Sequence, residues 1–233
     1  MVAVSRAQLR CAPDALEPVG AIPNPVDLES WPLQERKGDY VLWIGRLTAV
    51  KGPHRAIAAA RMAGVPLILA GVIQPGEQAF FDSEVAPHID GERVRYVGEV
   101  GGSVKRSLFA GARALLMPIR WNEPFGMVIV EALACGTPVI AFRDGAASEL
   151  VVDGTTGFLV DDEAAMADAI AHVARIAPAA CRRWVAAHCE VGVVARAYEQ
   201  VYRAAIRAGA AQHGDGAGLA PLATFGERIA RPR

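Results

Sequence analysis

The stretch that decides the fold is Asn122-Glu-Pro-Phe-Gly-Met-Val-Ile-Val-Glu-Ala-Leu-Ala-Cys-Gly-Thr-Pro-Val-Ile-Ala-Phe142. It predicts a helix over residues 125–134 and a buried strand over residues 139–142, because the Gly136 that follows Cys135 is a common helix stop. Pro124 would occupy the first helical turn, where its missing N–H costs nothing. A helix that runs directly into a buried strand is typical of an α/β fold.

The start of this helix is a candidate binding site. Backbone N–H groups of Phe125, Gly126 and Met127 would point out of the helix start, toward an anion or a hydroxyl group. Gly126 has no side chain, so a ligand could approach the backbone closely. Two carboxylates flank the start: Glu123 lies in the preceding loop, and Glu131 lies in the second turn. The pattern therefore predicts polar recognition at this point.

Glu131 is surrounded by apolar neighbours on a helix that the pattern predicts to be buried, so its ionised carboxylate needs partners. Two adjacent sugar hydroxyls would suit it, because an ionised carboxylate has two oxygens that only accept hydrogen bonds. The alternative is that Glu131 pairs with an arginine in the core and that Glu123 caps the helix. The residues alone leave both alternatives open.

Short apolar strands alternate with helices along most of the chain. Strands are predicted over residues 40–44, 66–70, 94–97, 114–117 and 139–142. Helices are predicted over residues 53–63, 78–89, 103–110 and 125–134, and again over 163–176, 178–188 and 192–206. Continuous apolar strands separated by helices indicate a parallel sheet covered on both faces. We therefore predict a doubly wound, Rossmann-like α/β domain with additional C-terminal helices.

The composition favours a globular protein. The 233 residues are 52% hydrophobic with a net charge of −1, which gives no basic excess for nucleic-acid binding. The cysteines show no CxxC spacing, so we expect neither a metal site nor a redox motif. No signal peptide and no apolar run of about 18 residues is present. We expect a cytoplasmic protein with at most peripheral membrane contact.

Loops that follow the predicted strands would share one edge of the sheet, where open α/β folds bind ligands. Those loops carry glycines and cover residues 45–52, 71–76, 98–102 and 118–126. In the first of them, Arg46 follows Gly45 directly and Lys51 opens the next helix. Arginine grips phosphate oxygens with two donors and lysine acts as a point charge, so the loop predicts a diphosphate site. The alternative is that both cations are ordinary solvated loop residues.

The sequence lacks the usual cofactor fingerprints. No GxGxxG follows the first strand, and there is no GxxxxGK[ST] motif. A nucleoside diphosphate held by Arg46 and Lys51, with a ribose on Glu131 and a polar group near Glu123, fits better than a dinucleotide or ATP. We expect no metal and no organic cofactor.

The chain resembles the retaining, nucleotide-sugar-dependent glycosyltransferases of family 4 (group 1), which have the GT-B fold. The resemblance covers roughly residues 20–205. The matching segments are Gly45-Arg-Leu47 with Lys51-Gly52, Tyr96-Val-Gly98, Glu123-Pro-Phe-Gly-x4-Glu131 with Ala132-x-Ala-Cys-Gly-Thr-Pro-Val139, and Glu149 with Asp153-Gly-x-Thr-Gly157. The Glu-x7-Glu signature in this context is specific to the family.

The resemblance implies a role for each candidate residue. Gly45, Arg46 and Lys51 would bind the donor diphosphate, and Glu131 the ribose hydroxyls. Glu123, as the catalytic carboxylate, would hold the transferred sugar together with backbone amides. The remaining implied contacts are the amides of Phe125, Gly126, Met127 and Val128 at the sugar, and the loop at Val97 and Gly98 at the base.

The resemblance also implies a domain organisation. Residues 1–21 look like the end of a preceding acceptor domain that is otherwise absent, and residues 22–39 like the linker. The donor domain would span residues 40–190, the crossover helix 191–207, and a flexible tail 208–233. A separate acceptor-domain subunit or self-association would follow. The alternatives are a nucleotide-sugar-binding module without catalysis and a GT-B sugar-nucleotide epimerase.

Overall fold

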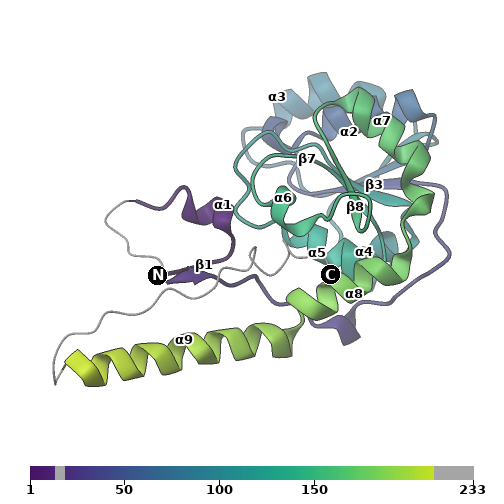
Figure 1. Cartoon of the computed structure of the whole chain (residues 1–233). Helices are drawn as coiled ribbons and strands as arrows, with labels where there is room; N and C mark the ends of the chain where they lie inside the picture. Colours follow the sequence, from purple (N-terminus) through teal and green to yellow (C-terminus); the bar gives the residue numbers. More distant parts are fainter. Residues whose placement is uncertain (14–18, 213–233) are drawn as a thin grey trace.

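The computed structural model describes residues 1–13 and 19–212 (Figure 1). Its centre is a six-stranded parallel sheet whose strands are largely buried. Its members are β3 (Val41–Ile44), β4 (Leu67–Ala70), β5 (Val94–Tyr96), β6 (Ala114–Met117), β7 (Val139–Phe142) and β8 (Gly157–Val160). The predicted parallel α/β fold is confirmed, and the sheet gains β8 as a sixth strand beside β7.

The strand order is β5-β4-β3-β6-β7-β8, which is the order of a Rossmann sheet. The chain starts in the middle at β3, moves outward to β5, and then returns to β6 on the other side of β3. Such a reversal leaves a crevice beyond the carboxyl ends of β3 and β6, because their following loops run in opposite directions. The crevice is where the loops with Arg46 and Glu123 begin.

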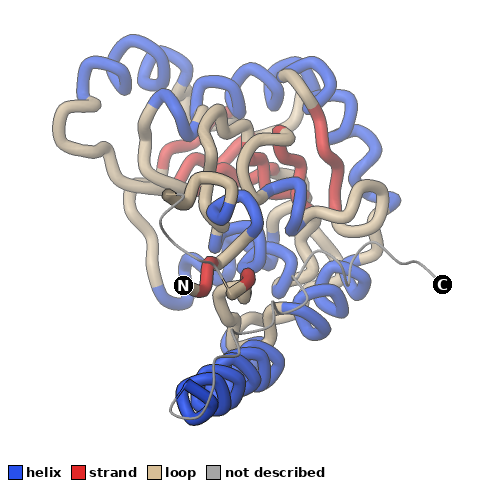
Figure 2. The backbone as a smooth tube through the Cα atoms, turned by 60° about the vertical axis from the view of Figure 1, so that its left-hand side comes forward, coloured by secondary structure: helices blue, strands red, loops and turns tan. Residues whose placement is uncertain are grey.

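Helices cover both faces of the sheet (Figures 1 and 2). One face carries α2 (Pro53–Ala63), α3 (Gln78–Phe80) and α7 (Glu163–His172); the other carries α4 (Gly102–Gly111), α5 (Met127–Ala134), α6 (Ala147–Leu150) and α8 (Pro178–His188). The bounds of α2 and α8 agree with the prediction, since proline opens each helix and has no N–H to lose there. Both faces are apolar, so the sheet is buried between two helical layers.

The helix of the opening stretch starts later than predicted. α5 begins at Met127, so the predicted start at Phe125 is wrong. Gly126 lies just before the helix with φ of 84°, a left-handed conformation that L side chains rarely adopt. This turn sends the Phe125 side chain into the core, where it is 3% exposed, and leaves Pro124 in the loop. The helical amides facing outward are therefore those of Met127 and Val128.

The last helix also ends later than predicted. α9 spans Val191–Gln212, so residues 208–212 are helical. This segment is rich in alanine, the best helix former, and extends a helix that already exists, which avoids the cost of nucleation. The rest of the predicted tail, residues 213–233, lies outside the described residues.

The first residues form a small unit beside the main domain. β1 (Val2–Ala3) pairs in parallel with β2 (Gly20–Ala21), and α1 (Arg6–Leu9) lies between them in the chain. α9 projects from the main domain and lies alongside this pair (Figures 1 and 2). A cavity of about 530 Å³ lies between them, lined mainly by small and apolar residues.

Arg182 on α8 fastens the segment before the sheet to the core. Its guanidinium donates to the carbonyl oxygens of Trp31 (2.6 Å), Ala134 (2.7 Å) and Leu28 (2.9 Å). Two of these carbonyls belong to the predicted linker, and the third ends α5. The linker therefore has a fixed course over the α5–α8 face. No helix in the described part of the chain combines the length and the apolar character that crossing a bilayer requires.

Candidate functional site

A cavity of about 220 Å³ opens at the crevice between β3 and β6. Its walls come from the end of β3, the loop after it, the end of β6 and the start of α5. The lining residues are Trp43, Ile44, Gly45, Arg46, Lys51, Leu116, Met117, Ile119, Glu123, Gly126, Met127 and Val128. Most residues of the predicted diphosphate and sugar sites thus meet in one place, as expected for loops at the carboxyl edge of a parallel sheet.

Lys51 and Glu123 form an ion pair inside this cavity, between Nζ and Oε2. Both side chains are only about one-seventh exposed, at 15% and 14%. The indole N–H of Trp121 donates to the same Glu123 oxygen at 3.0 Å, and the Lys51 ammonium lies 4.9 Å from the centre of the Trp121 ring. The three side chains come from two loops and fix each other in position.

The loop that carries Glu123 is held from several sides. The Glu123 carbonyl accepts from the Ala146 N–H at 2.9 Å, and its own N–H donates to the Trp121 carbonyl at 2.9 Å. A Cβ on Gly145 would lie 2.4 Å from the Glu123 nitrogen, so glycine is required there. The Ser5 hydroxyl donates to the Pro124 carbonyl. The backbone around Glu123 is therefore held in place at several points.

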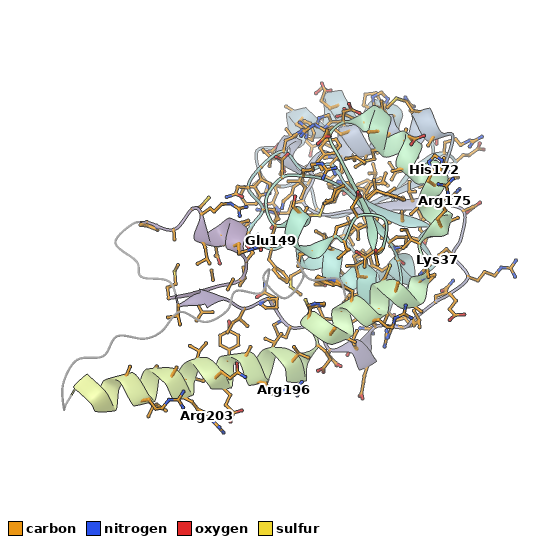
Figure 3. The ribbon with its side chains drawn as sticks, in the orientation of Figure 1. Lys37, Glu149, His172, Arg175, Arg196 and Arg203 are labelled. Carbon is orange, nitrogen blue, oxygen red and sulfur yellow. The ribbon has the colours of Figure 1, made fainter. Side chains whose placement is uncertain are left out.

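The N-terminal unit, formed by β1, α1 and β2, is joined to the main domain through Glu149. Figure 3 places Glu149 where α6 meets α1. Its carboxylate accepts from the backbone N–H groups of Arg6 (2.9 Å) and Ala7 (2.7 Å), which open α1. A carboxylate at a helix start satisfies amides that have no partner within the helix. Glu149 is 6% exposed, so this contact ties the first residues to the core.

Arg46 differs from Lys51 in that its side chain has no partner among the described residues. Its side chain is exposed, and it forms no hydrogen bond or ion pair within residues 1–13 and 19–212. It follows Gly45 at the end of β3 and lines the cavity. A cation that lines a cavity without a counter-charge of its own is available to an anionic ligand.

Glu131 lies one turn beyond Met127 and Val128 on α5 and pairs with Lys105 of α4, at 2.7 Å between Nζ and Oε1. The arginine partner considered in the alternative is thus replaced by a lysine. Glu131 is 7% exposed, and its Oε2 is buried without a hydrogen-bond partner among the described residues. The Lys105 ammonium also lies over the rings of Trp31 (5.7 Å) and Phe109 (5.8 Å). Unlike Glu123, Glu131 does not line the cavity of about 220 Å³.

The predicted base-contacting residues lie on the same edge but do not line the cavity. Val97 is 44% exposed after β5. The Gly98 carbonyl accepts from the Gly71 N–H at 2.7 Å, and a Cβ on Gly71 would lie 1.7 Å from the Gly45 carbonyl oxygen. Burial raises the pKa of Tyr96, and its hydroxyl donates to the Gly71 carbonyl at 2.8 Å. Three glycine loops are thus packed side by side.

Sequence reasoning missed Lys105 and Trp121, the partners of the two acids. Lys105 is one of three lysines, and Trp121 stands two residues before Glu123 in a polar loop; these are the only signals that the sequence offers. Neither spacing indicates an ion pair or a hydrogen bond. No group of three or more His, Cys, Asp or Glu residues in the described ranges could hold a metal ion.

The chain is similar to several known proteins. The chain is 32% identical over 209 residues to glycogen synthase of Mycobacterium tuberculosis, covering 82% of this chain and 50% of that relative. It is similar to the structure of AviGT4, a glycosyltransferase involved in avilamycin A biosynthesis, with a TM-score of 0.76 and 30% identity over 88% of this chain and 64% of that one. The chain spans about half the length of the curated relative.

A third comparison shows the fold alone. Anabaena HepE in complex with UDP-glucose is 24% identical, with a TM-score of 0.74 over 87% of this chain and 63% of that one. Residues 27–187 match the family described as glycosyl transferases group 1, and this range contains the sheet, the cavity and both acids. The chain belongs to the glycosyl transferases group 1.

Proposed function

We propose that this chain binds a nucleoside-diphosphate sugar and supplies the donor half of a glycosyl transfer that retains the anomeric configuration, as a C-terminal GT-B domain of family 4. The observation that carries the proposal is the meeting of Arg46, Lys51 and Glu123 in one cavity beside the start of α5. Two cations and a helix start suit a diphosphate, and carboxylates suit sugar hydroxyls.

Catalysis at such a site depends on positioning the substrates and on stabilising the charge that develops during transfer. Arg46, Lys51 and the amides at Met127 and Val128 stabilise negative charge on the departing diphosphate. Glu123 holds a hydroxyl of the transferred sugar and Glu131 the ribose. The nucleoside-diphosphate sugar is a substrate, and the proposal includes no metal or organic cofactor.

Titration calorimetry with UDP-, GDP- and ADP-sugars tests the donor site, beginning with UDP-glucose. We expect one nucleotide class to bind and Glu131→Gln to weaken it about tenfold, since the variant loses a charge-assisted hydrogen bond to the ribose. The 2′-deoxy analogue should bind the wild-type chain more weakly than the ribose form does. The Glu131→Gln variant should bind the 2′-deoxy analogue no more weakly than it binds the ribose form. Failure of the wild-type chain to bind any of these donors would refute the proposal.

Incubation of the donor with candidate acceptors distinguishes a glycosyltransferase from the two alternative functions. Transfer supports the glycosyltransferase. Binding of the donor with neither transfer nor sugar isomerisation identifies a non-catalytic module. Conversion of the free donor to its epimer identifies a sugar-nucleotide epimerase.

We further propose that the face formed by β1, β2 and α9 receives an acceptor domain or subunit. Tyr202 and Ile206 on α9 are 62% and 71% exposed, and the adjoining cavity is largely apolar. An apolar face without its partner favours self-association. Light scattering of the isolated chain is expected to show species larger than a monomer, and Ile206→Glu should reduce them. A monodisperse wild-type monomer would contradict this prediction.

A further inference from the structure

The role of Trp121 follows from an unusual combination of exposure and contact. The indole is 39% exposed, although tryptophan is a residue that proteins tend to bury. Its N–H is nevertheless committed, because it donates to Glu123 Oε2 at 3.0 Å. A side chain that keeps part of its ring in solvent while its polar atom is fixed has a defined surface to offer a ligand.

The second observation concerns how the Glu123 carboxylate is occupied. Oε2 receives both the Lys51 ammonium and the Trp121 indole N–H. Within the part of the chain that the structure describes, Oε1 accepts no hydrogen bond. A carboxylate fixed through one oxygen presents the other at a defined position, which is what recognition of a single sugar hydroxyl requires.

The third observation concerns Lys51, which serves two partners. It pairs with Glu123 and lies over the Trp121 ring, and it is also the cation proposed for the diphosphate. A phosphate oxygen would compete with Glu123 for its ammonium protons. The Trp121 N–H is donated to Glu123 and not to the diphosphate. It is therefore the contact that keeps Glu123 in place when the diphosphate binds Lys51.

We propose that Trp121 is a positioning residue and the outer wall of the sugar subsite: its N–H orients Glu123, and its exposed ring contacts the C–H face of the donor sugar. This inference rests on the proposed donor site. It adds a residue that the opening sequence pattern does not indicate, and it assigns that residue to the sugar and not to the nucleotide.

The assignment makes a test possible that separates sugar from nucleotide binding. Calorimetry compares the donor that binds best with its free nucleoside diphosphate, for example UDP-glucose with UDP. Trp121→Phe removes the N–H and keeps a ring, and we expect it to weaken binding of the sugar nucleotide about 3- to 10-fold, in line with the typical net contribution of one hydrogen bond. Trp121→Leu also removes the ring and should weaken binding of the sugar nucleotide at least as much. Affinity for the free nucleoside diphosphate should stay within about 2-fold in both variants.

Met62→Ala is the matched control, because Met62 is 56% exposed near the far end of α2 and its truncation should alter neither affinity. Thermal unfolding of each variant shows that the fold is retained. Equal losses for the sugar nucleotide and the free diphosphate, unchanged sugar-nucleotide binding in both Trp121 variants, or a wild-type chain that gains nothing from the sugar would each overturn the inference. If the wild-type chain binds no nucleotide at all, it is the proposed donor site that fails.

Discussion

Replacing Arg46 and Lys51 together by alanine is expected to weaken binding of the nucleoside-diphosphate sugar at least about 100-fold. Each cation would form charge-assisted hydrogen bonds with the diphosphate, worth about 1.5–3 kcal/mol, and about 1.4 kcal/mol corresponds to a factor of ten in affinity. Both residues line the same cavity, so the two losses act on one ligand. Titration calorimetry at fixed ionic strength measures the effect.

The single variants should differ in a second way. Arg46→Ala removes an exposed side chain that has no protein partner in the described ranges, so it should weaken the ligand without lowering stability. Lys51→Ala leaves the Glu123 carboxylate, whose side chain is 14% exposed, without its ion-pair partner and should also lower the unfolding free energy. A fitting control removes Arg61 and Arg93, two exposed cations, with the same change in net charge. Equal affinities of the two double variants would contradict a diphosphate site at Arg46 and Lys51.

Replacing Lys105 by methionine is expected to lower the unfolding free energy by about 2–3 kcal/mol. The change leaves the Glu131 carboxylate 7% exposed and without its counter-charge, and breaking a buried pair on one side typically costs about 3–5 kcal/mol. We expect a loss at or below the lower end of that range because the Lys105 side chain is 27% exposed and water can reach it. Urea denaturation followed by circular dichroism measures the change.

The double variant Lys105→Met/Glu131→Leu separates stability from function. It removes both charges, so most of the lost stability should return, while nucleotide affinity should stay low because no carboxylate faces the ribose. Arg203→Met provides the contrast: the Arg203–Glu199 pair is exposed on α9, at 67% and 57%, and its loss should change stability by less than about 0.5 kcal/mol. If Lys105→Met is as stable as the wild type, Glu131 does not depend on this partner.

The sequence predicted much of this site for a general physical reason. Apolar strands flanked by glycine and proline indicate a parallel sheet, and in such a sheet all the loops that follow the strands share one edge. That rule alone brings Arg46 and Lys51 to the same side as Glu123, although more than 70 residues separate Lys51 from Glu123 in the chain. The bounds of α2, β6, β7 and α8 follow equally from local composition.

Other features depend on contacts that no local pattern encodes. The start of α5 at Met127 is set by the left-handed Gly126, and the Glu149 carboxylate caps a helix 143 residues earlier in the chain. Local propensity could not reveal either of these, because a helix end is decided by the backbone conformation and the partners around it.

By itself, then, the amino-acid sequence determined the parallel sheet, its helices and the edge on which the cations and acids gather, because hydrophobic periodicity and the turn residues act over short distances. Only the tertiary structure decided that Lys51 holds Glu123 and that Lys105 holds Glu131. The partner of a buried charge is whichever side chain the packing of distant elements brings within a few ångströms, and the spacing of residues along the chain does not record that distance.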